Sequence, residues 1–325
     1  MSGDLYIGID GGQTSTKSVL ADENGHILAL GSGTPCDHIQ GVHGIERNRA
    51  AIHSAVQSVM DAAHIDPARI AGVGMAITGA APELGAEMVF AGIIREILQP
   101  EYLWIDHDVA GNLAGAAAGE PGVVVIAGGG SIAYGINATG TEWRAGGMGY
   151  LMGDEGSGWW IGLQAIQAAG KAADGRGPHT ELLPMVLDHF GFPTIRHVIS
   201  LLYGPDFTRD QVAALVPDVA RLAHADGIAA EIMSRAGVLL ADAALAVIHH
   251  LYEPGDEVSV YPTGGVFRSG DILTVPFAER LLDEWPGVLI RQPQYEPVFG
   301  ALLRIWQASG IEITPERLGR LHLLP

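Results

Sequence analysis

Residues 9–17, Ile-Asp-Gly-Gly-Gln-Thr-Ser-Thr-Lys, are the stretch that decides the fold. They follow a short apolar run, and further apolar runs come after them at residues 18–21 and 26–30, separated by Asn24-Gly25. Such runs divided by turn residues predict sequential strands. Glycines allow a backbone to approach an anion closely. The chain is therefore predicted to open with three strands, the first of which ends at a phosphate-binding turn.

This turn offers several kinds of ligand group. Backbone amides at Gly11, Gly12 and Gln13 and donors on Thr14 and Lys17 could bind phosphate, and Asp10 could hold hydrated Mg²⁺, which favours oxygen ligands. The alternative is a tight turn preceded by an acid, because glycine-rich turns are common.

Two better-known phosphate motifs do not fit the same stretch. A P-loop would need glycine where Thr16 stands, and a strand, not a helix, is predicted to follow. No Gly-x-Gly-x-x-Gly opens a helix after the first strand, so a dinucleotide-binding fold is poorly supported.

Apolar spacing along the chain predicts an alternation of helices and strands that occurs twice. After the opening strands we expect a helix at 48–63, a strand at 70–77, a helix at 83–97 and a strand at 102–105. After residue 122 we expect strands at 123–127, 132–136 and 143–147, helices at 157–173, 180–190, 209–224 and 227–250, and a strand at 257–261. Two of these strands also run into glycine turns, at 128–131 and 263–265. Three such turns are hard to explain by packing alone, so we expect them to contact a nucleotide.

Composition limits the classes of protein. A length of 325 residues favours two domains. A formal net charge of −19 and the absence of a basic run argue against a nucleic-acid partner.

Membrane insertion and export are also not expected. The apolar segment 227–251 contains Glu231, Arg235 and Asp242, which predicts a buried helix and not a membrane span. Acidic residues at the start of the chain do not suit a signal peptide. The single cysteine, Cys36, cannot form an intramolecular disulfide, which fits a reducing compartment. We therefore expect a cytoplasmic protein.

At this point the chain resembles the sugar-kinase, actin and Hsp70 superfamily, and within it the family that unites N-acetylglucosamine kinase with BadF/BadG-type activator ATPases. The stretches that carry the resemblance are 10–17, 108–111, 122–131, 146–157, 263–268 and 296–301.

The resemblance implies an α/β protein of two ribonuclease-H-like, or actin-like ATPase, domains, with ATP and Mg²⁺ in a cleft between them. The first domain would span residues 1–115 and the second 116–311. A C-terminal helix at about 312–325 would return to the first domain. A homodimer is implied by the family alone.

The resemblance also assigns roles. Asp108 would be the general base that accepts the proton of a sugar hydroxyl, and Asp154 would help to hold the sugar. The other substrate-binding residues would be Asp37, His38, Ser131, Gly146 and Gly147. The remaining nucleotide-binding residues would be Gly128, Gly129, Gly130, Gly264, Gly265 and Arg268.

Simpler interpretations stand beside these roles. Asp108 could cap a helix that begins at Val109, and Asp154 could be an acidic turn residue. Asp106 and His107 do not make a metal cluster with Asp108, because alternate residues of a strand end point to opposite sides.

The expected function is that of an ATP-dependent kinase acting on an amino sugar or hexose, most simply N-acetylglucosamine or glucosamine. This chain departs from the N-acetylglucosamine kinase pattern at Ile132, where asparagine is typical, and at Met148, where tryptophan is common. It also has Asp37 where asparagine is usual, and Asp37 could pair with the ammonium of glucosamine. The alternatives are an ATPase that activates a reductase or dehydratase, for which Cys36 alone supplies too few cluster ligands, and a non-catalytic sugar or nucleotide sensor.

Overall fold

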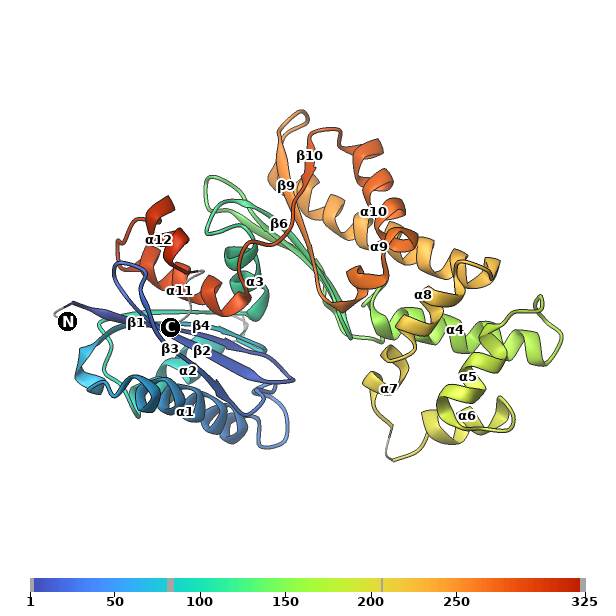
Figure 1. The fold of residues 1–325 in the computed structure, drawn as a ribbon, viewed down its shortest axis with the longest axis horizontal. Helices are drawn as coiled ribbons and strands as arrows, with labels where there is room; N and C mark the ends of the chain where they lie inside the picture. Colours follow the sequence, from blue (N-terminus) through green and yellow to red (C-terminus); the bar gives the residue numbers. More distant parts are fainter. Residues whose placement is uncertain (1–2, 81–84, 206, 322–325) are drawn as a thin grey trace. The chain divides into compact units, whose positions relative to one another are not determined.

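The computed structural model describes residues 3–80, 85–205 and 207–321. The chain divides into two compact units, shown in Figure 1. Unit 1 is Met1–Glu120 together with Gln292–Pro325, and unit 2 is Pro121–Arg291. Each unit is described by itself.

Unit 1 is built on a five-stranded mixed sheet with the strand order β3-β2-β1-β4-β5. The first three strands form an antiparallel meander, and β4 and β5 are parallel to β1. Its strands are β1 (Leu5–Gly11), β2 (Thr16–Asp22), β3 (Ile27–Gly33), β4 (Ile70–Ile77) and β5 (Tyr102–Asp106). Its helices are α1 (Gly44–Ala63), α2 (Ala86–Arg95), α3 (Asp108–Ala116), α11 (Pro297–Ala308) and α12 (Pro315–Arg320), with a 3₁₀ turn at Pro67–Arg69.

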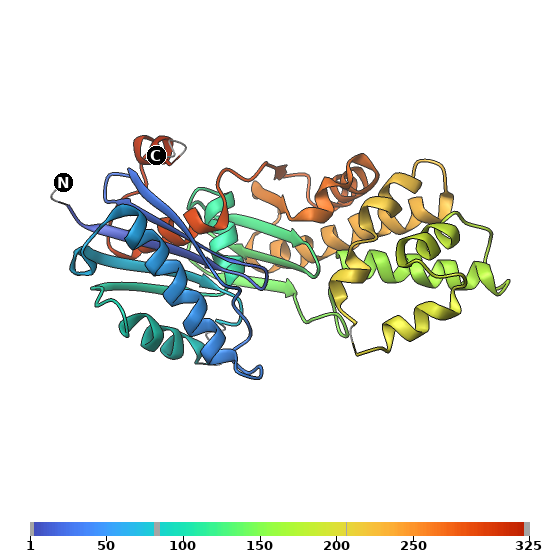
Figure 2. The ribbon, with the colours of Figure 1, turned by 60° about the horizontal axis from the view of Figure 1, so that its bottom comes forward.

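The two faces of this sheet bury different helices. Helices α1 and α2 lie on one face of the sheet (Figure 2). Leu5, Ile7 and Ile9 of β1 belong to the apolar cluster that includes residues of these two helices. Tyr6, one residue out of phase, belongs to the cluster formed with α11. Because successive side chains of a strand point to opposite faces, an uninterrupted apolar run buries both sides of β1.

Segment 292–311, expected in the second domain, lies in unit 1. Helix α11 packs on β1, β4 and α3. The approach to α3 requires glycine, since a Cβ atom at Gly300 would lie 1.9 Å from the Gly111 carbonyl oxygen. The boundary between the units therefore depends on where α11 docks, a property that hydrophobic spacing along the chain does not reveal.

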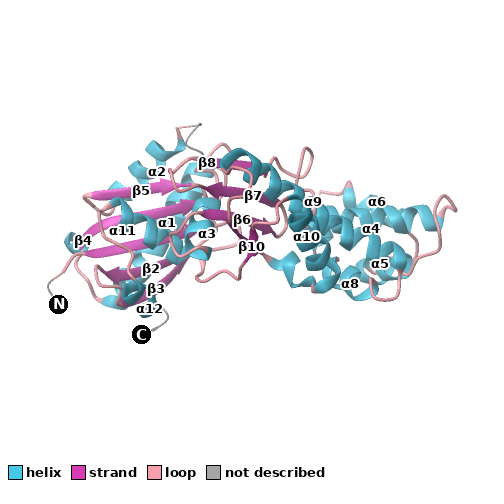
Figure 3. Ribbon diagram, turned by 90° about the horizontal axis from the view of Figure 1, so that it is seen from above, coloured by secondary structure: helices cyan, strands magenta, loops and turns pink. Residues whose placement is uncertain are grey.

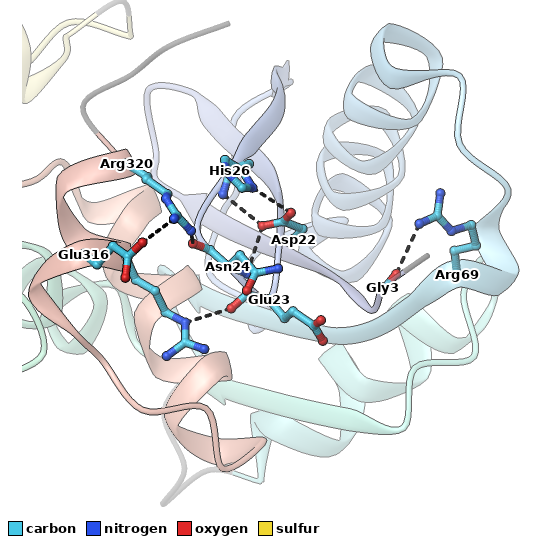
Figure 4. Close-up of polar contacts among 9 residues, drawn as sticks. Gly3, Asp22, Glu23, Asn24, His26, Arg69, Glu316 and Arg320 are labelled. Carbon is cyan, nitrogen blue, oxygen red and sulfur yellow. Dashed lines mark hydrogen bonds and ion pairs between the residues drawn. The ribbon is translucent and has the colours of Figure 1, made fainter. Parts of the chain in front are cut away.

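Helix α12 is anchored to the β2–β3 turn (Figure 4). Arg320 donates to the carbonyl of Asn24 at 2.8 Å, and Arg317 donates to the carbonyl of Glu23 at 2.9 Å. Arg320 also pairs with Glu316 one helical turn away. The final helix does return to the first unit, over residues 315–320; the remainder of its expected range beyond residue 321 lies outside the described residues.

Unit 2 has a sheet of strand order β10-β9-β6-β7-β8. Its strands are β6 (Gly122–Ala127), β7 (Ser131–Ile136), β8 (Glu142–Gly146), β9 (Val258–Thr263) and β10 (Val288–Ile290). Its helices are α4 (Gly158–Ala173), α5 (Leu182–Phe190), α6 (Arg196–Leu202), α7 (Arg209–Ala213), α8 (Val216–Leu222), α9 (Gly227–Leu251) and α10 (Asp271–Glu284), with a 3₁₀ helix η3 at Gly265–Ser269. Helices α4, α5, α6 and α8 gather beyond one end of the sheet of this unit (Figure 3).

The two sheets have the same topology. In unit 2, β6, β7 and β8 form an antiparallel meander, and β9 and β10 run parallel to β6, as β4 and β5 run parallel to β1 in unit 1. The repeated alternation of elements predicted from the sequence is thus a repeated fold.

Helix α9 is long and apolar enough to cross a membrane by length and composition, and 56% of its most apolar window is buried inside the protein. It packs on β7, β8, α4 and α10. This is the behaviour of a core helix with one polar side, as its three charged residues indicate.

The helix expected at 209–224 is wrong in one respect. It is two helices, α7 and α8, which divide before Pro217, and proline lacks the N–H that a continuous helix needs.

Helices α6, α10 and α11 and strand β10 lie outside the predicted elements. Helix α10 contains Pro276 in its interior, which obscures a helical pattern.

Candidate active site

Strand pairing brings Asp10 and Lys17 together on the α11 side of the unit 1 sheet. Asp10 is next to Ile9, which faces the opposite cluster, so the Asp10 side chain points toward α3 and α11. Lys17 is its direct partner in the antiparallel ladder. The short hairpin thus places a carboxyl group and an ammonium group beside each other at the end of β1.

Asp108 begins α3 and is oriented by a threonine that the sequence analysis did not single out. Thr78 donates its hydroxyl to Asp108 Oδ2 at 2.7 Å, and its N–H donates to the carbonyl of Gly11 at 2.8 Å. Thr78 follows β4, as Gly264 follows the equivalent strand β9. A comparison of the two repeated sheets could therefore have identified Thr78, because it follows the strand equivalent to the one that precedes the Gly264 turn.

Asp108 is not the N-cap of this helix. That position belongs to His107, whose Nδ1 accepts from the N–H of Ala110 at 3.2 Å. The Asp108 carboxylate is therefore not engaged in capping, and the helix dipole stabilises its negative charge in the first turn.

Asp10 and Asp108 form an acidic pair. Burial, together with the nearby charge of Asp108, raises the pKa of Asp10 to about 7. A divalent cation would relieve this repulsion, so the pair fits a Mg²⁺ site. Within the described residues no group of three or more His, Cys, Asp or Glu side chains could hold a metal ion. Magnesium commonly uses one or two carboxylates and completes its coordination with water and phosphate oxygens.

Lys17 is held by a partner distant in sequence. Its Nζ lies 2.6 Å from Glu296 Oε2, and both side chains are at least half exposed. Glu296 is the N-cap residue of α11. Exposed pairs of this kind contribute little to stability, so Lys17 can turn from Glu296 to a phosphate at small cost.

The hairpin leaves some backbone donors open. The N–H of Gly12 donates to the carbonyl of Ser15 at 3.0 Å and closes the turn. Within the described residues the N–H groups of Gln13 and Thr14 have no hydrogen-bond partner, and both residues are exposed. These two amides have the character expected of a phosphate-binding turn.

The loop that carries Asp37 and His38 is secured by an asparagine that the sequence analysis missed. Asn48 of α1 is fully buried; it accepts from the N–H of Asp37 and donates to the carbonyls of Asp37 and Gly44. His38 is exposed and lies against Gly79, directly after Thr78. The structure thus brings the 37–38 loop next to Gly79, which follows the residue that orients Asp108.

Asp37 already has a cationic partner. Arg47 Nη1 lies 2.7 Å from Asp37 Oδ2. The backbone N–H of His38 and the Arg47 guanidinium together lower the pKa of Asp37. The carboxylate is therefore charged but neutralised from within unit 1.

Cys36 is a buried thiol under the hairpin. Its Sγ lies 3.3 Å from Thr16 Oγ1, and burial raises the pKa of the thiol to about 11. A thiol with a raised pKa is a poor nucleophile.

In unit 2, the glycine turn after β6 is joined to the start of α4. The N–H of Gly158 donates to the carbonyl of Gly128 at 2.8 Å, and the N–H of Gly128 donates to the carbonyl of Gly130 at 2.9 Å. Among the described residues the N–H groups of Gly129 and Gly130 have no partner. The turn is rigid, with two donors remaining for an anion.

Ser131, predicted to bind the substrate, uses both of its donors within unit 2. Its N–H donates to Asp154 Oδ1 at 3.1 Å, and its hydroxyl donates to the carbonyl of Glu155 at 2.8 Å. Its amide is therefore not free for a phosphate, and its hydroxyl oxygen could contact a substrate only as an acceptor.

Asp154 is a buried carboxylate in a left-handed backbone conformation. Its side chain is 5% exposed and its φ is 60°. Burial raises the pKa of Asp154, and hydrogen bonding to Ser131 and the charge of Arg209 oppose this effect. Strained backbone geometry at a buried acid is characteristic of functional sites.

The remaining predicted glycines lie close to this turn. The N–H of Gly147 donates to the carbonyl of Ser131 at 3.0 Å, and Gly146 and Gly147 both have positive φ. Gly264 has φ 98°, and a Cβ there would lie 2.3 Å from the carbonyl oxygen of Ala127 at the end of β6. Gly265 and Arg268 are exposed on η3, which follows. Within unit 2 the second and third glycine turns are thus neighbours.

The comparisons with known proteins decide the family. The sequence profile of the BadF/BadG/BcrA/BcrD ATPase family matches residues 7–304. The chain belongs to this family. An N-acetyl-D-glucosamine kinase of Dictyostelium discoideum is 30% identical over 315 residues, which cover 93% of this chain and 98% of that relative. An N-acetylmuramic acid/N-acetylglucosamine kinase of Clostridium acetobutylicum is 30% identical over 227 residues, covering 70% of this chain and 74% of that relative.

Solved structures show the same fold. A candidate N-acetylglucosamine kinase from Chromobacterium violaceum is 28% identical with a TM-score of 0.75, covering 94% of this chain and all of the other. A glucokinase of the ROK family from Streptomyces griseus matches at a TM-score of 0.54 and 17% identity, over 94% of this chain and 99% of the other, and shows likeness of fold alone. The predicted family, its two-domain α/β fold and its use of ATP are confirmed for this BadF/BadG/BcrA/BcrD ATPase family member.

Proposed function

We propose that the protein is an ATP-dependent kinase that transfers a phosphoryl group to a hydroxyl of an amino sugar. The observation that carries this proposal is the carboxylate of Asp108, which is oriented by the Thr78 hydroxyl and is free of a capping role. A fixed carboxylate of this kind can accept the proton of an attacking hydroxyl, a contribution of typically 10²–10⁴ in rate.

The open amides of each unit support phosphate binding. In unit 1 these are the N–H groups of Gln13 and Thr14, with Lys17 beside them, and in unit 2 those of Gly129 and Gly130. Gly264, Gly265 and Arg268 would contact the rest of the nucleotide. The phosphoryl-transfer transition state carries charge on its oxygens, so positioned donors of this type lower the barrier.

Mg²⁺ is part of the proposal, with Asp10 as its protein ligand through water. Bound at the acidic pair, the ion would neutralise charge on the phosphates. The raised pKa of Asp10 supports this role, because a cation favours the ionised form of a buried carboxylate.

For the sugar, we propose Asp154 as an acceptor of hydroxyl hydrogen bonds, with His38, Gly146 and Gly147 beside the substrate. Between the two amino sugars the Asp37–Arg47 pair favours N-acetylglucosamine. An ammonium group on glucosamine would meet a carboxylate that Arg47 already neutralises. The names of the Dictyostelium and Clostridium relatives agree with an N-acetylated substrate.

The test is release of ADP from ATP and Mg²⁺ in the presence of N-acetylglucosamine, glucosamine, glucose, mannose or N-acetylmuramic acid. Asp108→Asn should lower kcat by 10²–10⁴, and Asp61→Asn, an exposed acid of α1, should leave it unchanged. Hydrolysis independent of sugar would indicate an activator ATPase. Tight sugar binding without turnover would indicate a sensor.

The choice of amino sugar has its own experiment. Arg47→Gln frees the Asp37 carboxylate and should shift the kcat/KM ratio toward glucosamine, whereas Asp37→Asn should not. An unchanged ratio in Arg47→Gln would show that Asp37 does not determine the preference between the two sugars.

A cytoplasmic homodimer belongs to the same proposal, and light scattering on the purified protein tests its oligomeric state.

A further inference from the structure

A pocket of about 240 Å³ lies in unit 2 between α4, α9 and the loop that follows α4. We call it the α4–α9 pocket. Its polar and aromatic lining includes Trp160, Gln164, Lys171, Thr180, Glu231 and Arg235. None of these belongs to the proposed catalytic, sugar-binding or nucleotide-binding residues.

Helical spacing produces this lining. On α4, Gln164 lies four residues after Trp160, and Lys171 lies seven residues after Gln164, so the three share one side of that helix. Glu231 and Arg235 are four residues apart near the start of α9. The two helices pack together, and these side chains line the same pocket.

The end of the pocket is held rigidly. Asp226 caps α9 by accepting from the N–H groups of Ile228 and Ala229 at 2.9 and 3.0 Å. The same carboxylate accepts from the Thr180 hydroxyl and from the N–H of Glu181, both at 2.7 Å. These bonds lower the pKa of Asp226 despite burial. The loop at Thr180 is therefore preorganised against α9, and a ligand would meet an already formed wall.

The charges in the pocket are not paired with each other. Within the described residues neither Lys171 nor Arg235 has a carboxylate within 4.0 Å, and Glu231 has no cation within that distance. Arg235 lies over the Trp160 ring, 6.0 Å from its centroid. Lys171 and Arg235 both line one concavity of a protein whose formal net charge is −19. Such a concavity attracts an anion.

Glu231 and the amide of Gln164 narrow the class of ligand. A bare anion would satisfy Lys171 and Arg235 but would leave the carboxylate of Glu231 facing negative charge. A molecule that carries both an anionic group and hydroxyl or ammonium donors satisfies all of them, because carboxylate and amide oxygens accept from such donors. Arg and Lys are the usual partners of phosphate.

We propose that the α4–α9 pocket binds a phosphorylated monosaccharide, with its phosphate at Lys171 and Arg235 and its hydroxyl or ammonium donors at Glu231 and Gln164. The choice of a sugar phosphate rests on the proposed function, of which it is the product class. The pocket also lies on the helix that supports the glycine turn, since α4 begins at Gly158, which donates to Gly128. Occupation of the pocket therefore bears on an element of the proposed nucleotide site.

The test is calorimetric titration of the full-length protein with N-acetylglucosamine 6-phosphate, with inorganic phosphate and with N-acetylglucosamine. The pocket variant is Lys171→Gln/Arg235→Gln. Its matched control is Arg196→Gln/Arg221→Gln, which removes the same charge from exposed positions of α6 and α8 outside the pocket. Asp154→Asn reports on binding at the proposed sugar site.

We expect the sugar phosphate to bind the wild type, the control and Asp154→Asn, and to bind the pocket variant about 100-fold more weakly, since two charged contacts are lost. Binding that survives in the pocket variant but disappears in Asp154→Asn would overturn the proposal. Equal affinity for inorganic phosphate would overturn the assignment to a sugar phosphate. The pocket variant should retain the melting temperature of the control, which separates loss of binding from loss of fold.

Failure of the proposed function would look different. If no sugar supports turnover but binding of the sugar phosphate is lost in the pocket variant alone, the kinase proposal fails and the α4–α9 pocket stands.

Discussion

Arg209 Nη1 lies 3.9 Å from the Asp154 Oδ2 atom, and the Arg209 guanidinium also lies over the Tyr150 ring, 5.3 Å from its centroid. Arg209 begins α7, at a capping box formed by Thr208 and Gln211. The arginine thus joins a fixed helix start to the loop that carries Asp154. It supplies positive charge to a carboxylate whose pKa is raised by burial.

Arg209→Gln should therefore raise the pKa of Asp154, because its removal leaves only the hydrogen bond from Ser131 to oppose burial and the neighbouring charge of Glu155. Asp210, whose carboxylate faces Gly129, adds negative charge nearby. Asp154 would then become protonated at a higher pH. We expect about a tenfold rise in the sugar KM and an acid limb of kcat/KM displaced to higher pH, with Arg209→Lys close to wild type. Identical pH profiles for the Gln variant and wild type would show that Arg209 acts only through packing.

Thr78→Val tests the orientation of Asp108. Valine preserves the shape of the buried side chain but cannot donate to Asp108 Oδ2. We expect kcat to fall about tenfold, in line with the loss of one hydrogen bond to a charged group, with the KM for ATP unchanged. Thr78→Ser should restore the rate, because serine retains the hydroxyl. A wild-type kcat in Thr78→Val would mean that Asp108 needs no orienting group.

Asp10→Asn should stabilise the protein at neutral and higher pH in buffer without Mg²⁺. The folded-state pKa of Asp10, about 7, lies above its ordinary value, so the folded protein retains a proton that the unfolded chain has lost. The free energy of unfolding of the wild type therefore decreases as pH rises from about 4 to 7. The variant lacks this decrease and should be more stable at pH 8 by ~1–4 kcal/mol.

Urea unfolding at several pH values, with EDTA present, measures this difference, and the advantage of the variant should shrink toward pH 4. Added Mg²⁺ with nucleotide should raise the melting temperature of the wild type more than that of Asp10→Asn. A variant less stable than the wild type at pH 8 would contradict the raised pKa.

Asn48→Ala should loosen the 37–38 loop. The side chain is fully buried, and its loss leaves the N–H and carbonyl of Asp37 without their partners. We expect a loss of about 2–4 kcal/mol in the free energy of unfolding, together with a higher sugar KM. The matched control is Gln57→Ala on the exposed side of the same helix, which should change stability by less than ~0.5 kcal/mol. Equal effects in the two variants would show that Asn48 contributes no more to stability and sugar binding than an exposed residue of the same helix.

Several elements were predictable because their determinants are local. Strands β1, β2, β4 and β6 are apolar runs bounded by glycine or polar turns, and the structure confirms each of them. Helices α1, α4 and α9 follow from the 3.6-residue spacing of their buried residues. Pro217 at the start of α8 and Pro276 inside α10 interrupt the helical pattern, so the boundary of α8 and the continuity of α10 were not predicted.

The contacts within the candidate site were predictable only in part. The residues Asp10, Asp108 and Asp154 came from motifs, but their partners Thr78 and Arg209 did not. Glu296 lies 279 residues from Lys17 and had no assigned partner. The commitment of the Ser131 amide to Asp154 also could not be foreseen, because it depends on how the loop after β8 folds back over the turn.

The sequence by itself determined the repeated sheet, the glycine turns and the acids that follow them, since apolar periodicity and glycine act over a few neighbouring residues. Only the tertiary structure decided which groups surround those acids and therefore their charge. Docking of α11 and α3 on the unit 1 sheet buries Asp10 near Asp108 and raises the pKa of Asp10, and the start of α7 brings Arg209 to Asp154. Desolvation and Coulomb interactions depend on distance in space and not along the chain.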